Sequence, residues 1–350
     1  MINDKVKLWA RIFDNEYNKI DADDFINNFS VWKKFYDNKS FLKEDLEEWA
    51  SNSINKINYI LRRDSAVLEI GCGNGLFPAY LNNKCSKYTG IDSSLICIER
   101  LKKYFKSNEK FDFCHKEAVC LEIDNNKYDI VIINSASQYF PNIEYFLKVL
   151  HISLSKLNIN GAIFIGDVRS LIHTWYLEKK FKSRYKNPDK FFKLENETLY
   201  NPGFFHLLPY IFKDISLVKV DLKRGIKNNE LSRYRFDVFI FKNNFDVLHN
   251  NLKNNDLNDF YFKNGRLQNL KNKLAASIEN NNNFLINNFD GSYYLDYDLS
   301  KGLDAVRLST FHFIKDNIDI NSNLLLTNKC VGMHNLSSLK KILNSNLINE

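Results

Sequence analysis

Three glycines at alternate positions follow a hydrophobic run near residue 70. The segment reads Val67-Leu-Glu-Ile-Gly-Cys-Gly-Asn-Gly75, so Gly71, Gly73 and Gly75 come just after Glu69. A backbone that turns sharply and lets a ligand lie against it requires glycine, because a Cβ would collide with the ligand. A helix that begins beyond the last glycine offers unpaired N–H groups to polar ligand atoms. The segment therefore predicts a binding loop for a nucleotide-like molecule.

A carboxylate stands at the end of the next hydrophobic run. The segment Tyr88-Thr-Gly-Ile-Asp92 places Asp92 17 residues after Gly75. A carboxylate at the tip of a second parallel strand can accept hydrogen bonds from both hydroxyls of a ribose. The dinucleotide fingerprint G-x-G-x-x-G would need glycine at position 76, which is Leu76. The two segments together predict a nucleoside site with Asp92 on the ribose and Glu69 near the ligand's far end.

The residues after the third apolar run are candidates for a contact with the base. His115-Lys-Glu-Ala118 follows Phe111–Phe113 and would lie beside the base of a bound nucleoside. We expect Ala118 to provide a flat contact, and Val119 or Cys120 to add backbone groups. Ordinary loop residues are the alternative interpretation at each of these positions.

Short apolar runs alternate with amphipathic stretches along much of the chain. The strand-like runs are Ala66–Ile70, Tyr88–Ile91, Phe111–Phe113, Ile130–Ile133, Ala162–Ile165, Ile215–Leu222 and Tyr234–Phe241. The stretches with helical spacing are Val6–Tyr17, Glu44–Leu61, Leu95–Phe105 and Ile143–Leu154. This alternation predicts an α/β fold, in which helices cover both faces of a parallel sheet.

The chain divides into three predicted regions. Residues 1–65 are an N-terminal helical region, and residues 66–242 form the ligand-binding core. Within the core, residues 175–210 are an aromatic-rich insertion, which predicts either a lid over a small flat substrate or an ordinary helical subdomain. Residues 243–350 are an accessory region with a helix near Leu267–Ile278.

The composition is typical of a globular protein. Hydrophobic residues make up 44% of the chain, and no run reaches the roughly 18 to 20 apolar residues that span a bilayer. The N-terminus has no apolar signal core, so we expect a cytoplasmic protein without a membrane partner. The net charge of +7 is spread as single lysines among asparagines, which argues against a nucleic-acid partner.

The six cysteines are scattered along the chain. They are Cys72, Cys85, Cys97, Cys114, Cys120 and Cys330. They form no C-x-x-C pair and have no histidine at ligand spacing. We therefore expect free thiols in a reducing compartment and no metal site.

Two further segments resemble a known family. Asn134-Ser-Ala-Ser-Gln-Tyr-Phe-Pro141 and Ile163-Phe-Ile-Gly-Asp-Val-Arg-Ser170 closely resemble the methyltransferase domains of nonribosomal peptide synthetases, which read N-S-V-x-Q-Y-F-P and I-F-I-G-D-V-R. Leu8–Asp14, Leu199–Phe205 and Arg224–Val238 extend the likeness. It implies a freestanding class I methyltransferase that uses S-adenosylmethionine, with a Rossmann-like, seven-stranded, mostly parallel sheet. The glycine loop and Asp92 would then hold this cofactor.

The resemblance and the sheet together suggest roles for the remaining polar residues. Ligands of a parallel α/β sheet lie beyond the carboxyl ends of its strands, and the turn that joins the last two strands returns to that edge. The predicted cofactor residues are Glu69 at the amino-acid end, Gly71, Gly73, Gly75, Asp92, Ala118 and Asn134. The catalytic candidates are His173, Asp167, Glu230 and Tyr139, and the substrate candidates are Gln138, Arg169, Glu178, Asn229 and Arg233.

Two departures from the family pattern affect these expectations. The family carries a histidine where this chain has Glu178, with His173 nearby, so the proton acceptor stays open among His173, Asp167, Glu178 and Glu230. The family usually carries an acidic residue after the alanine, where this chain has Val119. This departure affects only a predicted contact with adenine. A structural ion pair between Glu230 and Arg235 is the alternative to a catalytic role for Glu230.

The resemblance leaves the acceptor open. The family's chemistry implies N-methylation of an amino-acid-derived small molecule, free or held on a peptidyl carrier protein in natural-product biosynthesis. Freestanding relatives in saframycin-type pathways imply the alternative, C-methylation of a tyrosine-like ring. A nucleic-acid methylase would carry D/N-P-P-Y/F where this chain has Asn134-Ser-Ala-Ser. A non-catalytic binding partner with the same fold is a further alternative.

Overall fold

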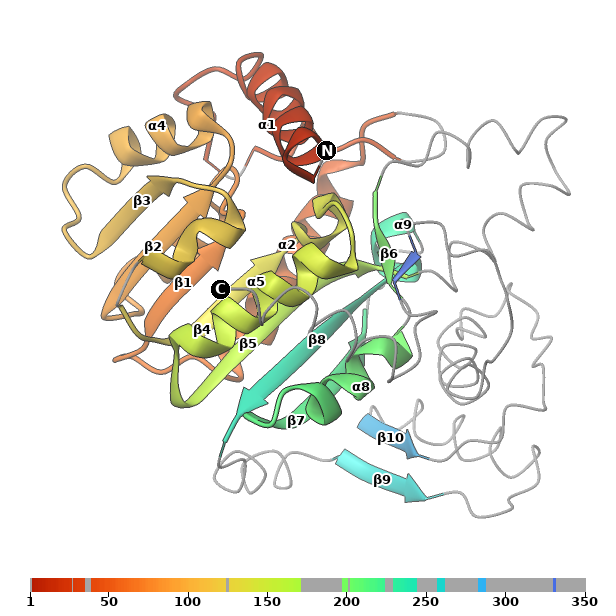
Figure 1. Cartoon of the computed structure of the whole chain (residues 1–350). Coiled ribbons are helices and arrows are strands. Elements are labelled where there is room, and N and C mark those ends of the chain that lie inside the picture. The colour runs from red at the N-terminus through yellow and green to blue at the C-terminus, as the bar shows by residue number, and fades with distance from the viewer. Residues whose placement is uncertain are drawn as a thin grey trace, which may run out of the picture.

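The computed structural model describes residues 2–26, 28–34, 39–123, 126–170, 197–200, 202–223 and 229–243, and the backbone of three short strands beyond them. Its centre is a seven-stranded sheet of order β3-β2-β1-β4-β5-β8-β7 (Figure 1). The strands are β1 (Ala66–Ile70), β2 (Lys87–Asp92), β3 (Phe111–His115), β4 (Tyr128–Asn134), β5 (Leu157–Arg169), β7 (Ile215–Leu222) and β8 (Arg235–Lys242).

The sheet is parallel except at one edge. Strands β1 to β5 pair in parallel, whereas β8 runs antiparallel to both β5 and β7. Antiparallel β8 is inserted between β5 and β7, so the turn before it returns to the carboxyl edge of the sheet. The predicted seven-stranded, mostly parallel α/β sheet is confirmed.

Helices cover both faces of this sheet (Figure 1). They are α1 (Ile2–Tyr17), α2 (Lys43–Asn58), α3 (Leu76–Leu81), α4 (Leu95–Tyr104), α5 (Ile143–Lys156), α8 (Pro202–Ile211) and α9 (Glu230–Arg233), with 3₁₀ turns η1 (Ala118–Ile123) and η2 (Ser137–Tyr139). Short strands complete the described elements: β6 (Leu199–Tyr200), β9 (Leu257–Tyr261), β10 (Asn283–Asn287) and β11 (Cys330–Val331).

Two hydrophobic cores, one on each face of the sheet, explain why the central strands have apolar residues at consecutive positions. In β1, Leu68 belongs to the core beneath α5 and α8, whereas Val67 belongs to the core beneath α2, α3 and α4. In β4, Val131 and Ile132 divide in the same way. Because successive side chains of a strand point to opposite faces, a strand buried on both faces needs apolar residues at every position.

The observed helices and strands differ from those predicted from the sequence mainly at their ends. Helix α2 ends at Asn58 rather than Leu61, and β8 begins at Arg235 because Tyr234 closes α9. The predicted helix near Leu267–Ile278 and most of the 175–210 insertion lie outside the described residues, as does most of the 243–350 region.

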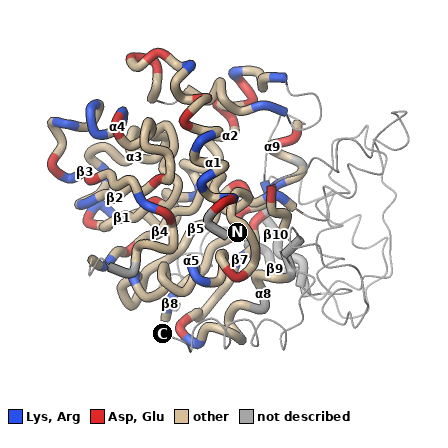
Figure 2. Tube along the Cα trace, turned by 45° about the horizontal axis from the view of Figure 1, so that its top comes forward, with Lys and Arg blue, Asp and Glu red and all other residues tan. Residues whose placement is uncertain are grey.

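Charge is mixed over the described part of the chain. Figure 2 shows Lys and Arg interspersed with Asp and Glu around the helices and loops. Among the described helices, none is both long and apolar enough to cross a membrane.

Candidate active site

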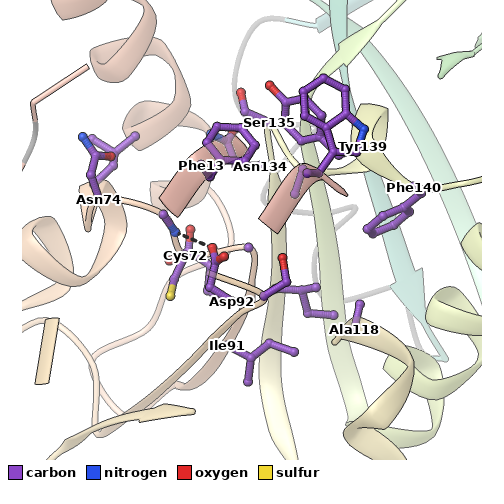
Figure 3. Close-up of a pocket in the computed structure, with 18 of the residues that line it drawn as sticks. Phe13, Cys72, Asn74, Ile91, Asp92, Ala118, Asn134, Ser135, Tyr139 and Phe140 are labelled. Carbon is purple, nitrogen blue, oxygen red and sulfur yellow. Dashed lines mark hydrogen bonds between the residues drawn. The ribbon is translucent and has the colours of Figure 1, made fainter. Parts of the chain in front are cut away.

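A cavity of about 130 Å³ opens where β1, β2 and β4 end (Figure 3). Figure 3 shows Asp92 between the loop that carries Cys72 and the turn at Ala118, with Phe13 and Tyr139 across from it. The predicted cofactor residues that line the cavity are Glu69, Gly71, Gly73, Asp92, Ala118 and Asn134. The aromatic residues of the N-terminal region that line it are Trp9, Phe13, Tyr17, Phe29, Trp32 and Trp49.

The glycine loop adopts a backbone that other residues rarely adopt. Gly71 and Gly75 have φ values of +80° and +86°. A Cβ on Gly71 would lie 2.7 Å from the Ala136 Cβ, so a side chain there would fill the cradle of the cavity. A Cβ on Gly75 would instead meet Leu101 at 2.8 Å, in the core. Gly75 is not among the residues that line this cavity, and its predicted contact with the cofactor stays a prediction.

Asp92 joins the two loops that face the cavity. One carboxylate oxygen accepts a hydrogen bond from the Gly73 N–H at 2.9 Å, and the other accepts one from the Ser94 N–H at 2.8 Å. Each carboxylate oxygen can accept a second bond, so both remain able to receive a ribose hydroxyl. Burial raises the pKa of Asp92, although these backbone hydrogen bonds oppose the rise.

Glu69 lies at the base of the cavity and is 3% exposed. Its carboxyl group accepts a hydrogen bond from the Tyr88 hydroxyl. Burial raises its pKa to about 8, against the effect of that hydrogen bond. The group is therefore mostly protonated at pH 7 in the free protein. A ligand ammonium beside it would favour the ionised form and lower its pKa.

This gives a first testable prediction. At pH 7, binding of S-adenosylhomocysteine, which carries such an ammonium, should release about one proton from Glu69. The release should disappear as the pH rises above 8, because the carboxyl group is then already ionised. Calorimetric titration in buffers of different ionisation enthalpy measures the number of protons released on binding. Glu69→Gln should bind without that release, and an equal release from both proteins would contradict the assignment.

A second cavity of about 260 Å³ adjoins the first. The residues that line both are Trp9, Phe13, Trp32, Ser135 and Tyr139. The Tyr139 ring lies 4.6 Å from Trp9 and 5.1 Å from Phe13, measured between ring centroids. Burial raises the pKa of Tyr139 above its usual value, so its hydroxyl is neutral and can donate a hydrogen bond. The junction between the cavities is therefore aromatic, with the neutral hydroxyls of Tyr139 and Ser135.

Buried polar atoms without partners mark both cavities. They are Asn134 Oδ1 in the first, and Gln138 Oε1 and Arg235 Nε in the second. Leaving such a group unpaired costs about 1–3 kcal/mol. A polar ligand recovers this free energy only if these side chains turn toward it, because each of the three atoms has almost no exposed surface.

Asp167 lies behind the second cavity in a buried cluster of charges. It is 0% exposed, has φ +61°, and accepts hydrogen bonds from the Ser135 hydroxyl and from Arg235. Lys223 Nζ lies 3.6 Å away. Burial alone would raise the pKa of Asp167, but the ion pairs with Arg235 and Lys223 outweigh it and lower the pKa. An ionised carboxylate that faces two cations is a poor proton acceptor.

Three residues predicted to act in catalysis or substrate binding have structural partners. Arg169 forms an ion pair with Glu197 at 2.7 Å. Glu230 lies 3.7 Å from Arg235, the ion pair that was weighed as an alternative. The Asn229 side chain caps α9 by accepting hydrogen bonds from two backbone N–H groups. Arg169, Asn229 and Glu230 do not line the two cavities, and their roles toward the substrate stay predictions.

Other predicted residues cannot be placed against the site. His173 and Glu178 lie outside the described residues, and Arg233 is described only by its backbone within α9. Ser135 and Glu197 line the second cavity, and the sequence singled out Ser135 but not Glu197. Ser135 directly follows Asn134, which places it at the carboxyl edge, but its φ of +52° has no signature in the sequence.

Comparison with known proteins relates the chain to one family. A family model described as "Methyltransferase domain" matches residues 68–159. Enniatin synthase of Fusarium equiseti is 31% identical over 237 residues, covering 61% of this chain and 7% of that protein. Chondramide synthase cmdD of Chondromyces crocatus is 26% identical over 252 residues, and the match covers 67% of this chain and 6% of that protein. The chain therefore spans less than a tenth of the length of these relatives.

Solved structures of similar fold are more distant in sequence. The plantazolicin methyltransferase BamL, in complex with a desmethylPZN analog and S-adenosylhomocysteine, is 18% identical with a TM-score of 0.45, covering 68% of this chain and 100% of that one. The N-methyltransferase NodS from Bradyrhizobium japonicum, with S-adenosylhomocysteine, is 13% identical with a TM-score of 0.39, covering 65% and 98%. The resemblance drawn from residues 134–141 and 163–170 is confirmed by the family model and the curated relatives.

Proposed function

We propose that this chain, an S-adenosylmethionine-dependent methyltransferase related to the methyltransferase domains of nonribosomal peptide synthetases, methylates the amino nitrogen of a small amino-acid-derived substrate. The observation that carries the proposal is the pair of adjoining cavities. The first has the glycine loop and Asp92, and the second has Gln138 and Arg235 with unpartnered polar atoms.

The residues of the first cavity fit the cofactor. The cradle at Gly71 has room only while no Cβ fills it, and Asn134 Oδ1 is a buried acceptor without a partner. In our assignment, Asp92 holds the ribose, Ala118 contacts the adenine and Glu69 receives the amino group. The cofactor supplies a methyl group on a positively charged sulfur, which is already activated for displacement.

The protein's task is then to align the acceptor and exclude water. The reacting atoms need to lie about 3–3.5 Å apart. The rings of Trp9, Phe13 and Tyr139 at the junction keep water out and present π faces that favour a nearby cation. Tyr139 can donate a hydrogen bond that orients the acceptor.

Two carboxylates and two cations line the second cavity, so its hydrogen-bond acceptors rather than its net charge suit an amine acceptor. An amino group has a pKa near 8 and is partly neutral at pH 7, so hydrogen-bond acceptors suffice to hold it. Gln138 Oε1 and the carboxylates of Glu16 and Glu197 are such acceptors. A phenol that directs ring methylation has a pKa near 10, and ionising it at pH 7 costs about 4 kcal/mol. Ring methylation would require a committed base.

The aromatic lining of the second cavity favours one alternative. Trp9, Trp32 and Phe41 would also suit a tyrosine-like ring, which keeps ring C-methylation as the second candidate. The acceptor can be presented free or as a thioester on a peptidyl carrier protein.

Mass spectrometry with a deuterated methyl donor separates these functions. The full chain is incubated with free amino acids, tyrosine included, and with aminoacyl thioesters of a carrier protein. We expect label on the amino nitrogen, located by fragmentation. Label on the tyrosine ring would establish the second candidate instead. Absence of label from every acceptor would contradict both.

A further inference from the structure

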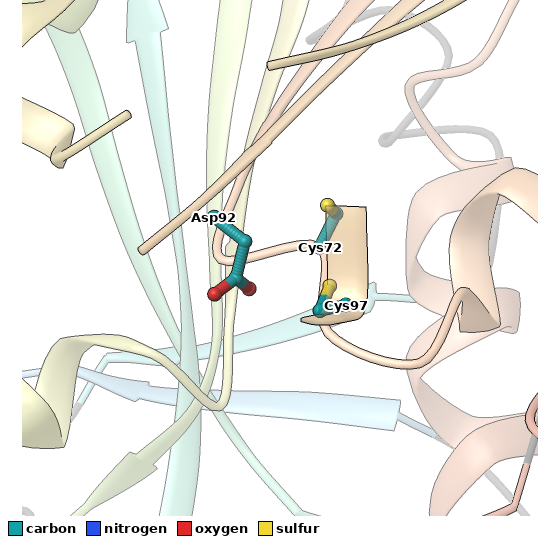
Figure 4. Close-up of side chains that lie close together, drawn as sticks. All are labelled: Cys72, Asp92 and Cys97. Atoms are coloured by element: carbon teal, nitrogen blue, oxygen red, sulfur yellow. The ribbon is translucent and has the colours of Figure 1, made fainter. Parts of the chain in front are cut away.

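Two cysteines that are far apart in the sequence meet beside the ribose carboxylate (Figure 4). Cys72 lies in the glycine loop and Cys97 lies in the first turn of α4. Their sulfur atoms and a carboxylate oxygen of Asp92 all lie within 4.8 Å of one another. Cys72 and Asp92 also line the cofactor cavity. The ligand atoms of Cys72 and Asp92 are therefore adjacent to space that a small ion can enter, and the fully buried Cys97 lies beside them.

The backbone around these three side chains is fixed. The Cys97 N–H donates to the Ser94 hydroxyl at 3.1 Å, and its thiol donates to the Gly73 carbonyl oxygen at 2.7 Å. Asp92 accepts from Gly73 and Ser94 in the same two segments. Hydrogen bonds therefore hold Cys97 and Asp92 against the same loop, in which the Cys72 N–H donates to the Ile91 carbonyl oxygen at 3.1 Å.

The donor set matches a thiophilic divalent cation. Zinc binds thiolate at about 2.3 Å and carboxylate at about 2.0–2.2 Å in tetrahedral sites. Tetrahedral angles then place the ligand atoms roughly 3.5–3.8 Å apart, so the side chains need to close by about 1 Å. Three protein ligands leave a fourth position for water on the cavity side.

We propose that Cys72, Cys97 and Asp92 bind a thiophilic divalent cation of the zinc class, and that the bound cation excludes S-adenosylmethionine. On binding, each thiol loses its proton to solvent and two metal–sulfur bonds form, together with one bond to a carboxylate oxygen. That oxygen is then no longer available to a ribose hydroxyl. The exclusion rests on the assignment of Asp92 to the ribose, whereas the binding of the cation does not.

Burial opposes the loss of the thiol protons, and a bound cation has to offset that cost. Burial raises the pKa of both thiols, and for Cys72 it does so to about 11. A divalent cation compensates the charge of two thiolates in this buried place, next to the carboxyl groups of Asp92 and Glu69. Binding should therefore strengthen as the pH rises, as it does wherever a metal displaces thiol protons.

Cadmium titration of the reduced full chain tests the proposal, because thiolate-to-cadmium charge transfer absorbs in the ultraviolet. We expect one tight equivalent with the charge-transfer band. Cys97→Ser should weaken this equivalent by at least about tenfold, because a hydroxyl is a far poorer ligand for this ion than a thiolate. Cys120→Ser, which changes an exposed thiol away from the cluster, should leave it unchanged.

Competition with S-adenosylhomocysteine tests the exclusion. Saturating S-adenosylhomocysteine should raise the apparent cadmium dissociation constant of the native chain at least about tenfold. Circular dichroism verifies that Cys97→Ser is folded, and Cys72→Ser serves as a second ligand variant for the optical titration. Equal cadmium affinity in the native chain and both variants would overturn the site. Simultaneous binding of both ligands would overturn the exclusion. Failure of S-adenosylhomocysteine to bind the metal-free chain would instead count against the cofactor assignment.

Discussion

Replacing Asp92 with alanine should weaken the binding of S-adenosylhomocysteine about a hundredfold, which corresponds to about 3 kcal/mol. Two hydrogen bonds from ribose hydroxyls to a charged acceptor would be lost, each worth about 1.5–3 kcal/mol. The Gly73 N–H would also lose its acceptor, so the glycine loop would be held less firmly. Isothermal titration calorimetry of the native and variant chains measures the difference.

Asp129 provides a matched control for this change. Its carboxylate accepts hydrogen bonds from the Ala66 N–H and the Asn158 side chain, both at 2.9 Å, at the opposite edge of the same sheet. Asp129→Ala should therefore change the affinity for S-adenosylhomocysteine by less than about twofold. Equal losses in the two variants would point to a general effect on the fold. Native affinity in Asp92→Ala would remove Asp92 from the cofactor site.

Replacing Asp167 with asparagine should lower the free energy of unfolding by about 3–5 kcal/mol at pH 7. The substitution keeps the shape of the side chain but removes the charge that Arg235 and Lys223 face. Both cations would then be buried without one of their counter-charges. Urea unfolding monitored by circular dichroism measures the change. Asp221→Asn is the control, because this carboxylate pairs with Lys56 at the more exposed end of the same cluster.

The pH dependence of the Asp167 effect has a definite sign. The pKa of Asp167 is lowered in the folded chain, so its contribution is fully present above the usual carboxyl pKa of about 4. It is lost as the pH falls through the folded value. The difference between the native chain and Asp167→Asn should therefore be large at pH 7 and shrink in acid. A constant difference across this range would contradict the ion-pair assignment.

Methyl-transfer kinetics of Asp167→Asn distinguish positioning from proton transfer. We assign Asp167 a positioning role, because it holds Ser135 and Arg235 at the second cavity. Loss of position should raise KM for the acceptor and leave the shape of the pH–rate profile unchanged. If Asp167 were the base, the acid limb of the profile would move or vanish in the variant.

The central elements could be predicted because their signals are local. A buried parallel strand is a short apolar run, and the loop after β1 needs glycine for its backbone, so both are visible without any knowledge of long-range contacts. Asp92 could be predicted for the same reason, since it ends the very next strand. The same local signal does not divide the glycines by role, because a glycine required for packing and one required for a ligand look identical in a sequence.

Features made by long-range contacts could not be predicted. Asp237 is fully buried within β8, and its Oδ2 lies 3.2 Å from Lys56 Nζ of α2. Neither segment of the sequence has a pattern that predicts this ion pair. Cys72 and Cys97 show no ligand spacing, yet the loop and helix α4 bring them together. Asn229 caps a short helix that was predicted only as a turn. His173 and Glu178 stay predictions, because they lie outside the described residues.

A crystal structure of the full chain with S-adenosylhomocysteine tests the central assignment most directly. Both ribose hydroxyls should bond to the Asp92 carboxylate, the adenine should lie against Ala118, and the sulfur should face the Tyr139 side of the cavity. A nucleoside bound elsewhere, or an Asp92 side chain turned away from the ribose, would contradict the account.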